Sequence, residues 1–147
     1  MREIYRFDHL WDGIVEIGPE GLVYELPVAS GHVDKIFRFA ISEAAFARMK
    51  ADPERRIFLQ AFLHSLYQMR PVTQQVTVDH HIDLILSGDP ARVEEVLNRQ
   101  EARDCGAVSN MVWILTGRDP APMRQGTWFA QGRGTARPCS SPCSSGG

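Results

Sequence analysis

The sequence predicts an α+β fold, in which an N-terminal antiparallel β-meander of three to four strands packs against a C-terminal helical half. Three observations lead to this prediction. Apolar and polar residues alternate through much of the first forty positions, apolar residues then recur at helical spacing up to about residue 116, and the composition finally shifts to Pro, Gly, Ser and Arg. A length of 147 residues and an apolar content of 44% suit one domain with one core.

Short segments of the first forty residues have the period-two alternation of half-buried strands. Two of them flank Gly18-Pro19-Glu20-Gly21, a turn sequence that predicts a hairpin. Because proline cannot donate to a strand ladder, we expect Pro27 to end the second arm. The expected strands are residues 4–7, 14–17, 22–26 and 36–41.

Helix-starting residues mark the second half of the chain. Ser42 is a favourable N-cap, and Asp52 and Asp89 are each followed by a proline at the first helical position. The expected helices are residues 43–49, 53–69, 91–102 and 107–116. The helix over 53–69 is apolar on most of its surface, which predicts that it is the central helix of the core. Its polar residues form one stripe at a spacing of four, namely Arg56, Gln60, His64 and Gln68.

Residues 72–87 fit two interpretations. Alternation through residues 76–86 is compatible with one strand, whereas Ile82, Ile85 and Leu86 have the spacing of a buried helical stripe. Gly88 follows as a helix C-cap and favours the helix for the second half. We therefore predict an extended segment over Thr73–Val78 and a helix over His80–Ser87.

The globular domain is expected to cover residues 1–118. From residue 119 onward the chain is rich in Pro, Gly, Ser and Arg, and Trp128-Phe129 is its main apolar feature. Such a composition buries too little apolar surface to offset the entropy of ordering. We expect residues 119–147 to form a flexible, disordered tail.

Charge and composition argue against several classes of partner. Sixteen basic and eighteen acidic residues give a net charge of −2, without the clustered basic residues that bind nucleic acid or an anionic membrane. No apolar run reaches the ~20 residues that span a bilayer, and the first residues do not have the pattern of a secretory signal. The three cysteines are an odd number clustered late in the chain. We expect a cytoplasmic protein that needs no cofactor.

One segment has the residue types of a metal site. Asp79, His80, His81 and Asp83 are ligand types for zinc, manganese or iron. Residues 76–81 also resemble one motif of the DHH phosphoesterase family, in which an apolar strand delivers Asp-His-His to a two-metal site. The resemblance implies a metal-dependent hydrolase. It covers about six residues, and the other aspartate motifs of that family are absent from this sequence.

The N-terminal quarter offers an alternative site, a protein-binding surface. If Glu16 and Glu25 project from the outer face of the hairpin, they form an acidic patch beside Trp11, Tyr5 and Tyr24. Aromatic residues are enriched at protein interfaces, and an acidic surface suits a basic partner. We name Trp11, Glu16, Tyr24 and Glu25 as the candidate partner-binding residues.

These observations favour a small non-catalytic protein-binding domain of the bacterial cytosol. Its concrete forms are an immunity protein that neutralises a toxin, or a secretion chaperone or adaptor. The partner is then another protein with a basic surface, and not nucleic acid or membrane. The alternative is the metal-dependent hydrolase that uses Asp79, His80, His81 and Asp83.

Overall fold

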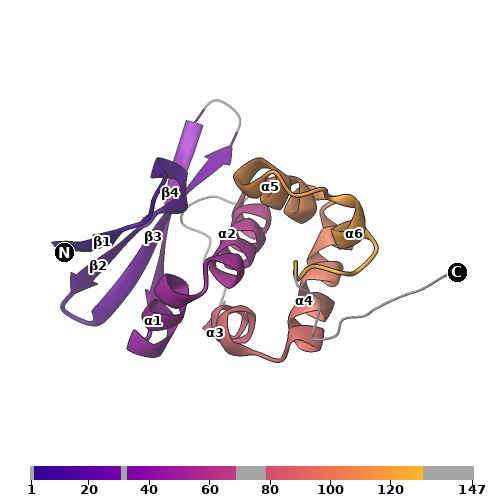
Figure 1. Ribbon diagram of the computed structural model, residues 1–147. Coiled ribbons are helices and arrows are strands. Elements are labelled where there is room, and N and C mark those ends of the chain that lie inside the picture. Colours follow the sequence, from indigo (N-terminus) through magenta and orange to yellow (C-terminus); the bar gives the residue numbers. More distant parts are fainter. Residues whose placement is uncertain (1, 31–32, 69–78, 131–147) are drawn as a thin grey trace, which may run out of the picture.

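The computed structural model describes residues 2–30, 33–68 and 79–130 of the chain. A four-stranded antiparallel sheet comes first and helices follow it, so the predicted fold class is confirmed (Figure 1). The elements are β1 (Arg2–Arg6), the 3₁₀ helix η1 (Leu10–Asp12), β2 (Ile14–Gly18), β3 (Gly21–Ser30), β4 (Val33–Ile41), α1 (Glu43–Ala51), α2 (Pro53–Tyr67), α3 (Asp79–Ser87), α4 (Pro90–Arg103), α5 (Ala107–Thr116) and α6 (Ala121–Arg124).

The sheet is a meander in the order β1-β2-β3-β4, with every neighbouring pair antiparallel. Val15 pairs with Tyr24, and Tyr24 pairs with Phe39, so these three side chains share one face. All three are buried. The helices lie on this side of the sheet, as Figure 1 shows, and the alternation that predicted the strands therefore also divides a core face from an outer face.

Pro27 does not end β3, and that prediction was wrong. The strand continues to Ser30, and Pro27 pairs with Ile36 of β4. The pairing of β2 with β3 begins at Ile14 and Glu25, so β2 does not extend alongside Pro27. Backbone groups of successive residues point to opposite sides of a strand. In this register the nitrogen of Pro27 points toward the β2 side of β3, at a position where β2 has no paired residue. The missing N–H therefore removes no hydrogen bond between strands.

The predicted helix starts are confirmed by their caps. The Ser42 side chain accepts a hydrogen bond from the backbone of α1 at 3.0 Å, and Asp52 and Asp89 do the same for α2 and α4. Residues 79–87 form the helix α3. The extended segment predicted over Thr73–Val78 lies outside the described residues.

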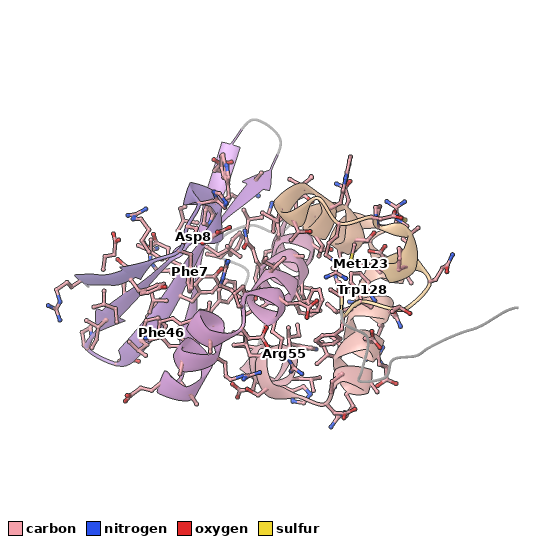
Figure 2. The ribbon with its side chains drawn as sticks, in the orientation of Figure 1. Phe7, Asp8, Phe46, Arg55, Met123 and Trp128 are labelled. Carbon is pink, nitrogen blue, oxygen red and sulfur yellow. The ribbon has the colours of Figure 1, made fainter. Side chains whose placement is uncertain are left out.

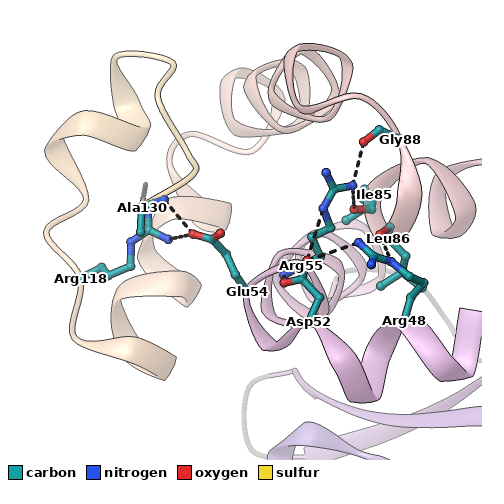
Figure 3. A network of polar contacts seen from close by, with 9 residues as sticks. All are labelled: Arg48, Asp52, Glu54, Arg55, Ile85, Leu86, Gly88, Arg118 and Ala130. Atoms are coloured by element: carbon teal, nitrogen blue, oxygen red, sulfur yellow. Dashed lines mark hydrogen bonds and ion pairs between the residues drawn. The ribbon is translucent and has the colours of Figure 1, made fainter. Parts of the chain in front are cut away.

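Helix α2 occupies the centre of the helical layer. It contacts β3 on one side and α1, α3, α4 and α5 on the others. Its side chains Phe58, Leu59 and Leu63 have no exposed surface, as predicted for the central helix. The C-terminal carbonyls of α3 are held by arginines of neighbouring helices (Figure 3): Arg55 donates to the Gly88 oxygen at 2.8 Å and Arg48 to the Leu86 oxygen at 3.1 Å.

Packed structure continues past residue 118, so the predicted domain boundary was wrong. Residues 119–130 include α6 and return to the helical layer, where Figure 2 shows Met123 and Trp128. Met123 and Trp128 are fully buried, and Phe129 is 8% exposed. Phe58 meets the rings of Trp128 and Phe129 edge-on. Residues 131–147 lie outside the described part of the chain.

Acidic side chains of earlier helices bind the backbone of this segment. Glu94 of α4 accepts from the Trp128 nitrogen at 2.7 Å, and Glu54 of α2 accepts from the Ala130 nitrogen at 2.7 Å (Figure 3). Arg118 pairs with Glu54 at 3.2 Å and donates to the Trp128 carbonyl. Few apolar residues therefore suffice to dock this segment, because backbone groups of residues 128–130 have charged partners in place.

Candidate functional site

Tyr24, one of the predicted partner-binding residues, belongs to the core. Its side chain has no exposed surface, and its hydroxyl donates to the Asp12 carbonyl at 2.8 Å. Burial raises the pKa of the Tyr24 hydroxyl, with the nearby Arg56 charge acting in the opposite direction. Tyr24 cannot contact a partner without unfolding of the sheet, and its assignment to a binding surface was wrong.

Glu16 and Glu25 lie on the outer face of the sheet, because they alternate with the inward-facing Val15 and Tyr24. Glu25 is ion-paired with Arg38 of β4 at 2.6 Å. One edge of the same sheet carries a second ion pair, between Glu3 and Arg6 at 2.7 Å. These arginines offset much of the expected negative charge, so the sheet does not present a purely acidic patch.

Trp11 lies on the other side of the sheet, where η1 meets the helices. Its side chain is 56% exposed and forms one wall of a cleft of about 210 Å³. We call this feature the Trp11 cleft. It is lined by residues of η1, β3, α2 and α5, namely Trp11, Pro27, Ala29, Gln60, His64, Met111, Ile114 and Leu115. The predicted acid–aromatic surface is thus divided between two faces, and the cleft brings Trp11 together with residues that the sequence did not connect to it.

Two residues of the polar stripe of α2, Gln60 and His64, line this cleft and hold its walls. Gln60 donates to the Trp11 carbonyl at 2.9 Å, and His64 Nε2 accepts from the Ala29 nitrogen at 3.2 Å. One turn earlier, Arg56 lies 3.6 Å from the buried carboxylate of Asp12. These three residues of the stripe therefore face the sheet, where they fix η1 and β3 against α2.

His64 is neutral in this arrangement. Its Nε2 atom can accept the Ala29 N–H only in the tautomer that carries the proton on Nδ1. Burial lowers the pKa of His64, and the carboxylate of Asp34 opposes this in part. The cleft thus combines apolar walls with two polar side chains, each of which already binds the backbone of a cleft wall, which favours contact with apolar groups.

The predicted metal residues lie on α3, a helix, whereas the family motif that they resemble is delivered by a strand. His80 is exposed, and the His81 ring packs on Phe62 with their centroids 5.2 Å apart. Asp79 begins the helix and Asp83 is exposed one turn later. Within the described ranges no group of three or more His, Cys, Asp or Glu side chains is placed to hold a metal ion.

Comparison of the chain with known proteins found no matching protein-family model, no matching curated protein and no matching solved structure. Among the residues that the structure describes, no helix has both the length and the apolar character to cross a membrane. The functional interpretation therefore rests on the geometry of the site.

The α5 side of the cleft was missed by sequence reasoning. Met111 and Leu115 have the helical spacing of a buried stripe, yet both are half-buried and line the cleft. Trp113 and Ile114 interrupt the polar side of the same helix and are 49% and 62% exposed. A helix that is apolar beyond its buried stripe is the signal that could have indicated a contact surface.

Proposed function

We propose that the chain is a small non-catalytic protein-binding domain and that a partner protein binds at the Trp11 cleft. The observation that carries the proposal is the pair of apolar side chains at the rim of the cleft, Trp11 and Ile114, both more than half exposed. Exposed aromatic and apolar side chains beside a hollow are typical of the central contacts of protein interfaces.

The size and chemistry of the cleft support a side chain as its occupant. A volume of about 210 Å³ is below the roughly 300–1,000 Å³ of sites that enclose a metabolite or drug-sized ligand. Gln60 and His64 contribute the polar groups, and both are engaged with the backbone of the cleft walls. An apolar side chain projecting from a partner fits these conditions better than a polar substrate does.

The two concrete forms of this function differ in the state of the partner. An immunity protein binds a folded toxin, whereas a secretion chaperone or adaptor binds an extended or helical segment of its client. The ion pair between Glu25 and Arg38 weakens the expectation of a strongly basic partner surface. We therefore place the main contact at Trp11 and Ile114 in either form.

The proposal is tested by recovering the partner from the native host with the unaltered chain as bait, and then measuring its affinity for purified variants. Ile114→Asp places a charge at the rim of the cleft and should weaken binding by roughly 30-fold or more, the loss expected for a central interface contact. Ile36→Asp is the matched control, since Ile36 is 37% exposed on the outer sheet face. Equal affinities of the two variants for the recovered partner would refute the assignment of the cleft.

A further inference from the structure

A second hollow runs between α2 and α4, on the far side of α2 from the Trp11 cleft. Two adjoining cavities of about 420 and 260 Å³ share Leu66, Gln100 and Arg103 as lining residues. The larger cavity continues toward Asp104 and Cys105, and the smaller one toward His81 and Arg99. We call this continuous feature the α2–α4 groove, and its combined size falls in the range of small-ligand sites.

The α4 side of the groove carries arginines without acidic partners. Arg92, Arg99 and Arg103 have no carboxylate within ion-pair distance in the described part of the chain. Most arginines of the other described elements do pair with acids, namely Arg6, Arg38, Arg48, Arg55, Arg56 and Arg118. The unpaired positive charge is therefore concentrated on one helix.

Helical spacing places these arginines on one face. A single stripe along α4 contains Arg92, Val96, Arg99 and Arg103, which are separated by four, three and four positions. Arg99 and Arg103 are neighbours on this stripe and both line the groove. Two adjacent guanidinium groups can hold one phosphate or carboxylate group through several charge-assisted hydrogen bonds.

The acidic residue inside the groove is already engaged. Asp104 accepts a hydrogen bond from Gln100 at 2.6 Å and another from the Ser65 hydroxyl. These bonds direct its carboxylate toward α2 and leave the guanidinium of Arg103 unpaired. Apolar surface is also present, since Phe62, Leu66 and Val96 line the smaller cavity.

His81 lines the smaller cavity and has one buried side-chain atom, Nδ1, without a hydrogen-bond partner among the described residues. Buried polar atoms without partners are rare in folded proteins and are found where a ligand or water completes the site. Burial lowers the pKa of His81, and the positive charges of His80 and Arg99 add to this effect. The ring is therefore neutral, and the positive charge of the groove comes from its arginines.

We propose that the α2–α4 groove binds a small organic anion, whose phosphate or carboxylate group is held by Arg99 and Arg103 and whose apolar part packs on Phe62, Leu66 and Val96. This site is separate from the Trp11 cleft and does not depend on the protein-binding function. It would make the domain responsive to a metabolite as well as to a protein.

Isothermal titration calorimetry of the full chain tests the proposal with three probes: phenyl phosphate, inorganic phosphate and benzyl alcohol. Phenyl phosphate should bind with a dissociation constant below about 1 mM, and each of the other two, which lack one half of the ligand, should bind at least about tenfold more weakly. The absence of saturable phenyl phosphate binding overturns the proposal. If inorganic phosphate binds with the same affinity as phenyl phosphate, the apolar part of the ligand makes no contribution and the proposal of an organic ligand is overturned.

Variants locate the site. Arg103→Gln and Arg99→Gln should each weaken phenyl phosphate binding about tenfold or more, because a charge-assisted hydrogen bond is lost. Arg2→Gln is the matched control, since Arg2 is an exposed arginine on β1, remote from the groove. Equal effects of Arg2→Gln and Arg103→Gln overturn the assignment of the groove.

A gain-of-affinity variant guards against loss of binding through misfolding. Glu95 is exposed on α4 and lies three positions after Arg92 and four before Arg99, which makes it a neighbour of the arginine stripe. Glu95→Gln removes its negative charge and should tighten phenyl phosphate binding severalfold. Weaker binding by this variant, with an unchanged melting temperature, contradicts the electrostatic argument.

Discussion

Trp128 is expected to be one of the largest single contributors to stability, although it lies in a segment whose composition suggested disorder. Its side chain is fully buried against Phe58, and its indole nitrogen donates to Asn98 at 2.7 Å. Truncating a buried tryptophan to alanine costs about 3–5 kcal/mol, since apolar contact is lost and a cavity remains. At a typical unfolding entropy of about 2.1 cal/mol/K per residue, a domain of about 130 residues then melts about 11–18 °C lower.

Urea denaturation followed by circular dichroism measures the free energy of unfolding of Trp128→Ala directly. Trp113→Ala is the matched control, because Trp113 is the same residue type on α5 and is 49% exposed. We expect the control to lose less than about 1 kcal/mol, as is usual for surface positions. If the two variants lose similar stability, or if Trp128→Ala loses less than about 1 kcal/mol, the docking of residues 119–130 on the helical layer is refuted.

Four further substitutions, of which Gly117→Ala is the comparison for Gly13→Ala, test the contacts that position the cleft. Gly13→Ala should cost about 3 kcal/mol or more, because Gly13 has φ +88° and an added Cβ would lie 2.4 Å from a carbonyl oxygen of β3. Gly117→Ala, at φ +77° with open space around it, should cost only about 1 kcal/mol in the same denaturation assay. Gln60→Leu should cost about 1–3 kcal/mol of stability, because the Trp11 carbonyl loses its donor. Hydrogen exchange in η1 should also become faster. Unchanged exchange would argue that the Gln60 hydrogen bond does not hold η1 in place. His64 has a folded pKa below its ordinary 6.5, so the unfolded chain binds the proton more readily and stability falls as the pH drops below about 6.5. A His64→Gln variant should lack this part of the pH dependence, and an identical pH profile for the two proteins would contradict the assignment.

Local signals predicted most of the secondary structure. Period-two alternation located the four strands, and the caps Ser42, Asp52 and Asp89 located the starts of three helices to within a residue. These features depend on neighbours in the sequence, and local reasoning can therefore find them. The prediction for Pro27 was wrong because a missing N–H breaks a strand only where a neighbouring strand lies opposite it. Whether one does depends on where β2 begins, which is a tertiary property.

The domain boundary could not be predicted from composition. Docking of residues 119–130 depends on Glu54, Glu94 and Asn98, which are distant in sequence and give no local indication of their partners. An average over the segment also dilutes Trp128 and Phe129 among residues that favour disorder. Two large buried rings, together with the carboxylates of Glu54 and Glu94 that accept from backbone N–H groups, are enough to reverse the expectation.

The error at Tyr24 was avoidable. A two-residue turn at Pro19-Glu20 pairs Val15 with Tyr24, so Tyr24 must share the face of Val15, while Glu25 must lie on the other face. Assigning Tyr24 and Glu25 to one surface contradicted the period of the strand. The cleft itself was beyond such reasoning, because its walls come from η1, β3, α2 and α5, and their juxtaposition is a tertiary property.

The polar stripe of α2 connects the stability of the domain to its proposed binding surface. A stripe at a spacing of four on a helix usually indicates a solvated face, yet Arg56 and Gln60 are 7% and 2% exposed and bind η1 instead. Such buried polar contacts stabilise only when every partner is in place. Weakening one of them should therefore lower stability and also displace Trp11, so that variants of Gln60 lose partner affinity through the position of Trp11 as well as through the altered lining of the cleft. A variant that lost stability with unchanged affinity would separate the two effects and place the partner elsewhere than at Trp11.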